Sequence, residues 1–336
     1  MTSAFISGCS GPELTPGEIA FFRDAKPAGL ILFARNCESP DQVRRLTDAF
    51  RNAVGAGDTL VLIDQEGGRV QRLVPPHWRA LPPAAAFGAL YAGNPDKARR
   101  AASLAARLTA RDLLSLGVNM NCAPVLDLPV PGSHGIIGDR AYGTSAEIVA
   151  ALGRSVAEGL IFGGVLPVIK HIPGHGRARS DSHLELPVVD TSMAELEAQD
   201  FAPFKRLADM PAAMTAHVVF TAIDAKAPAT TSLAVVQDVI RDLIGFDGLL
   251  MSDDLGMKAL QGPMAERTEQ ALFAGCDVAL HCNGNLDEMR QVAEAAEGME
   301  TEARFRYARC LALLGGNQPF DVAEAEALLA EVLAMS

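Results

Sequence analysis

One short stretch holds most of the side chains that could do chemistry. It reads KHIPGHGRARSDSH, from Lys170 to His183, and it contains three histidines, an aspartate and a lysine among glycines and a proline. Side chains of these types could bind a metal ion, form a Schiff base through the lysine, or transfer protons from a loop. The spacing of the residues and the rest of the chain bear on each possibility.

A metal site is the weakest of the three possibilities. Ile-Pro-Gly separates His171 from His175, and this tripeptide cannot form the helix that would place ligands at i and i+4 on one face. No HExxH or CxxC motif occurs elsewhere in the chain. We therefore predict neither a metal ion nor another cofactor.

Lys170 is better suited to bind a ligand than to attack one. A nucleophilic lysine needs a lowered pKa, which desolvation or a second cation supplies. Here carboxylates follow several of the apolar segments, and they would favour the charged ammonium. We expect Lys170 to act as a fixed cation that hydrogen-bonds a ligand hydroxyl, with a purely structural salt bridge as the alternative.

The sequence Asp181-Ser182-His183 favours proton transfer. A carboxylate two residues from an imidazole can bind one ring nitrogen, which fixes the tautomer and raises the basicity of the other nitrogen. Gly174 and Gly176 would let this segment bend, and we expect it to be mobile until a ligand fills the site. The alternative is a surface histidine that happens to lie near a surface aspartate.

Two adjacent carboxylates, Asp253 and Asp254, close the apolar segment GLLMSDDLGM at 248–257. Neighbouring residues on a strand point to opposite faces, so we expect only one of them to face a ligand. That arrangement allows one ionised nucleophile, while the other carboxylate supports a loop or caps a helix.

Further charged residues occur in IDQEGGRVQRL (63–73) and GDRAYG (138–143). The first motif supplies Asp64, Arg69 and Arg72, and the second supplies Arg140. Carboxylates and guanidinium groups around one cavity suit a polyhydroxylated ring, because each hydroxyl both donates and accepts hydrogen bonds. Any one of these arginines alone is more often part of a surface ion pair.

The elements that must position these residues alternate along the chain. Eight segments are apolar throughout, which is typical of parallel strands covered on both faces; they are 4–7, 29–36, 59–68, 117–127, 164–176, 212–220, 247–254 and 276–284. Helical patterns lie between them, at 40–54, 94–117, 145–164, 191–209 and 266–276. The alternation predicts an α/β fold, a (β/α)8 TIM-type barrel. A doubly wound open sheet is the alternative, although no GxGxxG motif follows the early strands.

We expect a single domain spanning 1–336, with C-terminal helices from about residue 300. A TIM barrel carries its site at the carboxyl ends of its strands. The polar residues expected there are Arg35, Asp64, Asp127, Lys170, His171, His217, Asp253 and His281.

Composition excludes several classes of protein. The net charge is −12 and no run of five basic residues occurs, which disfavours a nucleic-acid partner. The N-terminus lacks the features of a signal peptide, and no apolar run is long enough to span a membrane. The six cysteines are scattered, as expected for reduced thiols. We expect a soluble cytoplasmic protein with no membrane partner.

The motifs together resemble those of bacterial β-N-acetylhexosaminidases of glycoside hydrolase family 3. LILFARN, IDQEGGRVQRL, GDRAYG, KHIPGHG-x4-DSH and MSDDLGM occur in the same order and at similar spacing, from about Gly29 to Gly284. The KHIPGHG-x4-DSH segment together with SDD is the most specific part. Two departures are Ile172, where an aromatic residue is common, and Arg177, where Asp is frequent.

The resemblance implies a role for each motif. Asp253 would be the nucleophile, and His183 the general acid/base with Asp181 as its partner. The sugar-binding residues would be Asp64, Arg72, Arg140, Lys170 and His171. The substrate would be a terminal, non-reducing β-1,4-linked N-acetylglucosamine on 1,6-anhydro-muropeptides, cleaved without a cofactor in cytoplasmic cell-wall recycling. The oligomeric state stays open, a monomer included.

Two alternative functions remain at this point. Histidine in place of a second carboxylate would not repel an incoming anion, so transfer of the sugar to phosphate is a rival to hydrolysis. The barrel could also be a sugar-binding protein without catalytic activity that senses muropeptides. The combination of Asp253 with Asp181 and His183 favours an enzyme, because a binding protein needs none of the three.

Overall fold

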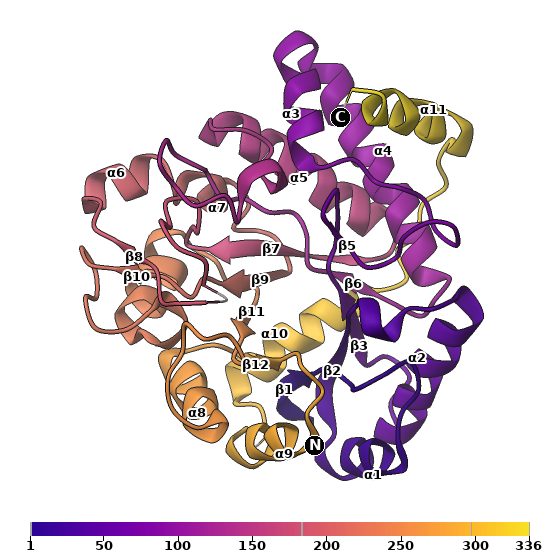
Figure 1. Cartoon of the computed structure of the whole chain (residues 1–336), viewed down its shortest axis with the longest axis vertical. Helices are drawn as coiled ribbons and strands as arrows, with labels where there is room; N and C mark the ends of the chain where they lie inside the picture. The colour runs from indigo at the N-terminus through magenta and orange to yellow at the C-terminus, as the bar shows by residue number, and fades with distance from the viewer. Residues whose placement is uncertain (1, 183, 297, 336) are drawn as a thin grey trace.

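The computed structural model describes residues 2–182, 184–296 and 298–335. Eight strands, all paired in parallel, close into a barrel in the order β1-β12-β11-β9-β7-β6-β3-β2 (Figure 1). Each apolar segment predicted as a strand supplies one of them, so the predicted TIM-type (β/α)8 barrel is confirmed. The strands are β1 (Ser3–Ser7), β2 (Pro27–Leu32), β3 (Leu60–Ile63), β6 (Met120–Asn121), β7 (Leu166–Ile172), β9 (Ala212–Thr215), β11 (Leu249–Asp254) and β12 (Val278–His281).

The pairing of the first and last strands closes the barrel. β1 pairs with β12 on one side, where Phe5 lies opposite Ala279, and with β2 on the other, where Ser7 lies opposite Leu30. Every residue of β2, β3, β7 and β9 is buried. This burial on both faces explains why the strand segments are apolar throughout rather than alternating.

Helices surround the barrel, and side-chain caps set where several of them begin. Ser39 accepts a hydrogen bond from the backbone N–H of Gln42 and Asn94 accepts one from that of Lys97, which satisfies N–H groups of the first turn. The helices before the C-terminal pair are α1 (Pro16–Ala25), α2 (Pro40–Val54), α3 (Ala84–Gly93), α4 (Pro95–Leu114), α5 (Ala146–Phe162), α6 (Met193–Ala198), α7 (Ala202–Arg206), a π-helix at Val235–Leu243, α8 (Met264–Ala274) and α9 (Leu286–Ala295).

The predicted helix at 191–209 is two helices. α6 ends at Ala198, and α7 begins at Ala202 with Pro203 in its first turn. Proline has no N–H to continue a preceding helix but fits the first turn of a new one. The break places Asp200, which is buried, between the two helices.

Two C-terminal helices, α10 (Thr301–Ala312) and α11 (Val322–Leu333), follow residue 300 as predicted. α10 is held to the barrel by Tyr307, whose hydroxyl donates to the carbonyl of Ala28 over 2.9 Å. α11 lies against α3 and α4 (Figure 1). All six cysteines are free thiols, and no helix in the described ranges is long and apolar enough to cross a membrane.

Two short two-stranded sheets lie outside the barrel. β4 (Gln65–Gly67) and β5 (Val70–Gln71) form an antiparallel hairpin directly after β3. The turn requires glycine, because Gly67 and Gly68 have φ angles of 112° and 55°, which side chains rarely adopt. β8 (Val188–Val189) and β10 (Val219–Phe220) form a second, parallel pair.

Candidate active site

A cavity of about 250 Å³ lies at the carboxyl ends of the barrel strands. Among the residues that line it are six of the eight predicted site residues, namely Asp64, Arg72, Arg140, Lys170, His171 and Asp253. Ser182, between the predicted acid/base pair, also lines the cavity. His183 itself lies outside the described residues. The structure therefore brings together side chains that are far apart in sequence.

Lys170 is the centre of a buried ion cluster in this cavity. Its ammonium nitrogen Nζ lies 2.7 Å from Asp64 Oδ1 and 2.7 Å from Glu66 Oε1, and its side chain is 2% exposed. Arg72 donates to Asp64 over 3.2 Å, and Arg140 donates to both oxygens of Glu66 over 2.9 Å. Positive and negative groups thus alternate along the floor of the cavity.

The cluster fixes the charge of each member. Burial alone would lower the pKa of Lys170, but Asp64 and Glu66 outweigh it and raise that pKa above its usual range. Burial alone would raise the pKa of Asp64, but Lys170 and Arg72 hold it well below its usual range. A charged ammonium is a hydrogen-bond donor and not a nucleophile, which argues against a Schiff base on Lys170. Its hydrogen bond to a ligand hydroxyl stays a prediction.

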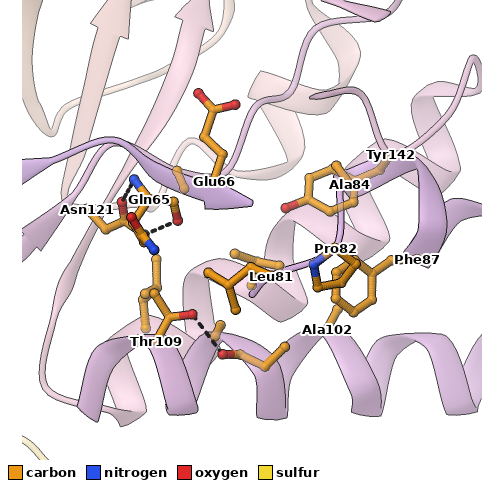
Figure 2. A pocket seen from close by; sticks show the side chains of 15 residues that line it. Gln65, Glu66, Leu81, Pro82, Ala84, Phe87, Ala102, Thr109, Asn121 and Tyr142 are labelled. Atoms are coloured by element: carbon orange, nitrogen blue, oxygen red, sulfur yellow. Dashed lines mark hydrogen bonds between the residues drawn. The ribbon is translucent and has the colours of Figure 1, made fainter. Parts of the chain in front are cut away.

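Glu66 was not among the predicted site residues. It lies two residues after Asp64 in IDQEGG, and in extended chain residues two apart point the same way. Its backbone position is fixed through Gln65, which exchanges two 3.0 Å hydrogen bonds with the side chain of Asn121 (Figure 2). The alternation of Asp64 and Glu66 was the signal that could have identified it.

A second, smaller cavity of about 30 Å³ lies behind Glu66. Figure 2 shows Glu66 on one side of it, Thr109 and Ala102 of α4 on the opposite side, and the rings of Phe87 and Tyr142 at its end. Its lining is mostly apolar. This cavity lacks the cluster of charged side chains that the larger one holds, so we place the chemistry in the larger cavity.

Asp127 organises the KHIPGH segment. Its Oδ2 lies 2.6 Å from Nδ1 of His171, and its Oδ1 accepts from the backbone N–H of His175 over 2.6 Å. Burial would raise the pKa of Asp127, but His171 outweighs burial and lowers it. Because Nδ1 of His171 donates to this carboxylate, Nε2 is the ring nitrogen left for a ligand.

Asp253 has the environment of an ionised carboxylate. Burial would raise its pKa, but His217 and His171 outweigh burial and the pKa falls below its ordinary value. One carboxylate oxygen also accepts from the backbone N–H of Asp254 over 2.8 Å. His217, which is fully buried, is held by Thr230 over 2.7 Å and by the carbonyl of Asp254 over 3.0 Å.

The prediction that only one of Asp253 and Asp254 faces the site is wrong. Both line the cavity, and the pairing of β11 with β12 shifts register between Met251 and Asp254. Asp254 Oδ1 accepts from the backbone N–H groups of Gly256 and Cys282 over 2.9 and 3.1 Å. Its carboxylate therefore supports the loops around the site, and burial raises its pKa.

Four of the strand-end residues, namely Arg35, Asp127, His217 and His281, do not line the cavity. Arg35 donates to the carbonyls of Cys9 and Cys282, and its guanidinium lies 5.0 Å from the ring centroid of Phe33. His281 Nε2 lies 3.0 Å from Glu288 in α9. Both residues hold the loops of the barrel rim and stay outside the cavity.

The segment that leads to Asp181 is closely packed. A Cβ atom at Gly176 would lie 2.0 Å from the carbonyl oxygen of Leu128, so only glycine fits there. Arg177 binds Asp200 over 2.6 Å and Glu195 over 2.9 Å, and Ile172 is fully buried in β7. The two departures from the family motif therefore lie away from the cavity lining.

Known proteins with similar sequences are glycoside hydrolases. The model of the glycosyl hydrolase family 3 N terminal domain matches residues 18–310. A β-hexosaminidase of Alkalilimnicola ehrlichii is 42% identical over 282 residues, which cover 83% of this chain and 80% of that protein. A β-hexosaminidase of Methylobacillus flagellatus is 38% identical over 315 residues, which cover 92% of this chain and 88% of that protein.

Solved structures show the same fold. NagZ from Neisseria gonorrhoeae, in complex with N-trifluoroacetyl-D-glucosamine, superposes with a TM-score of 0.89 at 32% identity, over 98% of each chain. A family 3 β-N-acetylglucosaminidase from Paenibacillus superposes with a TM-score of 0.87 at 31% identity, over 99% of this chain and 67% of the other.

Proposed function

The chain belongs to glycosyl hydrolase family 3 and is a glycoside hydrolase of the β-N-acetylhexosaminidase type, and we propose from this a specific substrate and mechanism. The enzyme releases terminal, non-reducing N-acetylglucosamine from 1,6-anhydro-muropeptides in cytoplasmic peptidoglycan recycling. It retains the β configuration through a glycosyl-enzyme intermediate on Asp253. The observation that carries this proposal is the position of Asp253 in the same cavity as the Lys170 ion cluster, in surroundings that lower the pKa of its carboxyl.

The ion cluster is suited to hold the sugar ring. Asp64 and Glu66 accept hydrogen bonds from sugar hydroxyls, while Arg72, Arg140 and Lys170 donate to them. These groups already hold one another in place, so little conformational entropy is lost when the sugar binds. His171 adds one further polar group through Nε2. A sugar held by its hydroxyls in this way presents its anomeric carbon to Asp253.

The reaction proceeds in two steps. In the first, a carboxylate oxygen of Asp253 forms a bond to the anomeric carbon while the glycosidic bond breaks, and His183 gives its proton to the leaving oxygen. In the second, His183 takes a proton from water, and the water oxygen displaces Asp253 from the anomeric carbon. Two displacements at one carbon restore the β configuration. Asp181 orients His183 throughout.

Replacing His183 by alanine tests its role as the acid. We expect about a 100-fold loss in kcat/KM for a substrate with a poor leaving group, because general acid catalysis is worth about that much or more. A dinitrophenyl N-acetylglucosaminide needs little protonation, so the loss in its first step should be much smaller. Pre-steady-state release of dinitrophenol measures that step. Equal losses for both substrates would contradict the acid role.

Product analysis distinguishes hydrolysis from phosphorolysis and from binding without turnover. In millimolar phosphate we expect free N-acetylglucosamine as the main product, since water is the acceptor. Dominant formation of a sugar 1-phosphate would show that phosphate is the acceptor instead. Failure to turn over any chromogenic N-acetylglucosaminide would favour a binding protein.

A further inference from the structure

Ser182 connects the segment between Asp181 and His183 to two strand ends at once. Its hydroxyl oxygen lies 3.0 Å from Nε2 of His175, which follows β7. Its carbonyl accepts from the backbone N–H of Ala259 over 3.2 Å, and Ala259 follows β11, the strand that carries Asp253. Ser182 is 3% exposed, so both contacts are shielded from water.

His175 is itself rigidly placed. Its backbone N–H donates to Asp127 over 2.6 Å, and its ring lies 5.6 Å from that of His171, centroid to centroid. Its side chain is 3% exposed. The backbone of His175 is therefore held by the same buried carboxylate that orients His171.

The surroundings of His175 also fix its proton. Burial lowers the pKa of His175 to about 4, so the ring is neutral at neutral pH. Its Nδ1 is buried without a hydrogen-bond partner in the part of the chain that the structure describes. If the proton of the neutral ring is on Nε2, that nitrogen donates to the hydroxyl of Ser182, and Nδ1 carries only a lone pair without a partner.

We propose that His175 and Ser182 are positioning residues for the acid/base, and that their hydrogen bond holds the Asp181–His183 segment between the sugar-binding strand end and the nucleophile. This role rests on the proposed function of His183. Neither residue needs to exchange a proton with the substrate. Their effect is to keep the imidazole of His183 within reach of the leaving oxygen.

A positioning role has a specific kinetic consequence. Loss of the hydrogen bond lowers the fraction of time that the acid is in place, so it slows reactions that need protonation of the leaving group. Reactions with a good leaving group depend little on the acid. A residue that only stabilised the fold would instead affect both kinds of substrate to the same degree.

The test compares Ser182→Ala with a matched pair of variants at His175. Glutamine places an amide nitrogen near the position of Nε2, whereas asparagine is too short to do so. We expect Ser182→Ala and His175→Asn to lower kcat/KM for an unactivated N-acetylglucosaminide by about tenfold. The step that releases dinitrophenol should fall less than about twofold. His175→Gln should recover most of the loss.

A double variant separates this proposal from the assignment of His183. In a chain that already carries His183→Ala, adding Ser182→Ala should cause no further loss, because no acid remains to be positioned. A further tenfold loss would overturn the positioning role, as would equal losses of Ser182→Ala on both substrates. If the loss of activity caused by His183→Ala alone does not depend on the leaving group, the acid role of His183 in the proposed function is contradicted, whatever the effect of Ser182→Ala. Urea unfolding of each variant confirms that it folds.

Discussion

Asp253→Ala is expected to abolish turnover, with a loss in kcat of at least about 10⁴-fold, because no other group can form the glycosyl-enzyme bond. Binding of N-acetylglucosamine should survive and be measurable by calorimetry, since the ion cluster around Lys170 does not depend on Asp253. Steady-state assays with a chromogenic substrate measure the loss.

Asp254→Asn is the matched control for this result. Asparagine keeps an oxygen that can accept from Gly256 and Cys282, so the loops around the cavity should stay in place. We expect this variant to lose far less activity than Asp253→Ala. If Asp254→Asn proved the more damaging change and Asp253→Ala kept substantial activity, the two aspartates would have to exchange roles.

Lys170→Met has the largest expected effect on stability. The ammonium compensates two buried carboxylates, Asp64 and Glu66, and removing one partner of a buried ion pair costs about 3–5 kcal/mol. Arg72 and Arg140 still contact one carboxylate each, so the protein should fold but unfold at lower urea concentration. Equilibrium urea denaturation measures the free energy of unfolding.

Lys205→Met is the control for this effect. Lys205 pairs with Glu197 over 2.8 Å, but both side chains are partly exposed, at 33% and 44%. Surface ion pairs contribute at most about 1 kcal/mol, so this substitution should change stability little. Similar losses at the two positions would show that burial of the Lys170 cluster does not matter.

The stabilisation by the cluster should depend on pH in a defined direction. Folding lowers the pKa values of Asp64 and Glu66. Their contribution to the free energy of unfolding is therefore complete above their ordinary pKa values of 3.8 and 4.5, and it is lost as the pH falls through their pKa values in the folded protein. The pKa of Lys170 is raised, so its contribution is complete below 10.5 and is lost at higher pH. The stability difference between wild type and Lys170→Met should therefore shrink in acid. A difference independent of pH would contradict the ionic origin.

The fold was predictable because burial on both faces leaves a simple pattern. All eight barrel strands lie in segments that are apolar throughout, including β6, of which only Met120–Asn121 is regular strand. The helices α1, α3 and α9 and the π-helix at Val235–Leu243 were not predicted. α3 illustrates why, since AAAFGALYAG has almost no polar residues to define a helical face.

The site residues were predictable where a charged residue stands at the end of an apolar strand segment. Contacts between loops were not predictable, because they depend on tertiary packing. Asp64, Lys170 and Asp253 each follow an apolar strand segment, and all three line the cavity. The contacts of Ser182 with His175 and Ala259 connect the loop after β7 to the loop after β11, and no local pattern marks them. Their geometry appears only after the barrel has closed.

Gly176 shows a related difficulty. Its sequence context was interpreted as a source of flexibility, whereas the structure shows close approach to the backbone of Leu128. A glycine required for close packing and a glycine required for bending have the same sequence signal. The predicted mobility of the segment up to His183 therefore stays a prediction.

The central claim is that Asp253 forms a covalent bond to the sugar, and a trapping experiment tests it most directly. A fluorinated N-acetylglucosaminide analogue with an activated leaving group slows breakdown of the glycosyl-enzyme, so the adduct accumulates. Peptide mapping by mass spectrometry should locate the label on the carboxylate of Asp253. A label on any other side chain would contradict the mechanism described above.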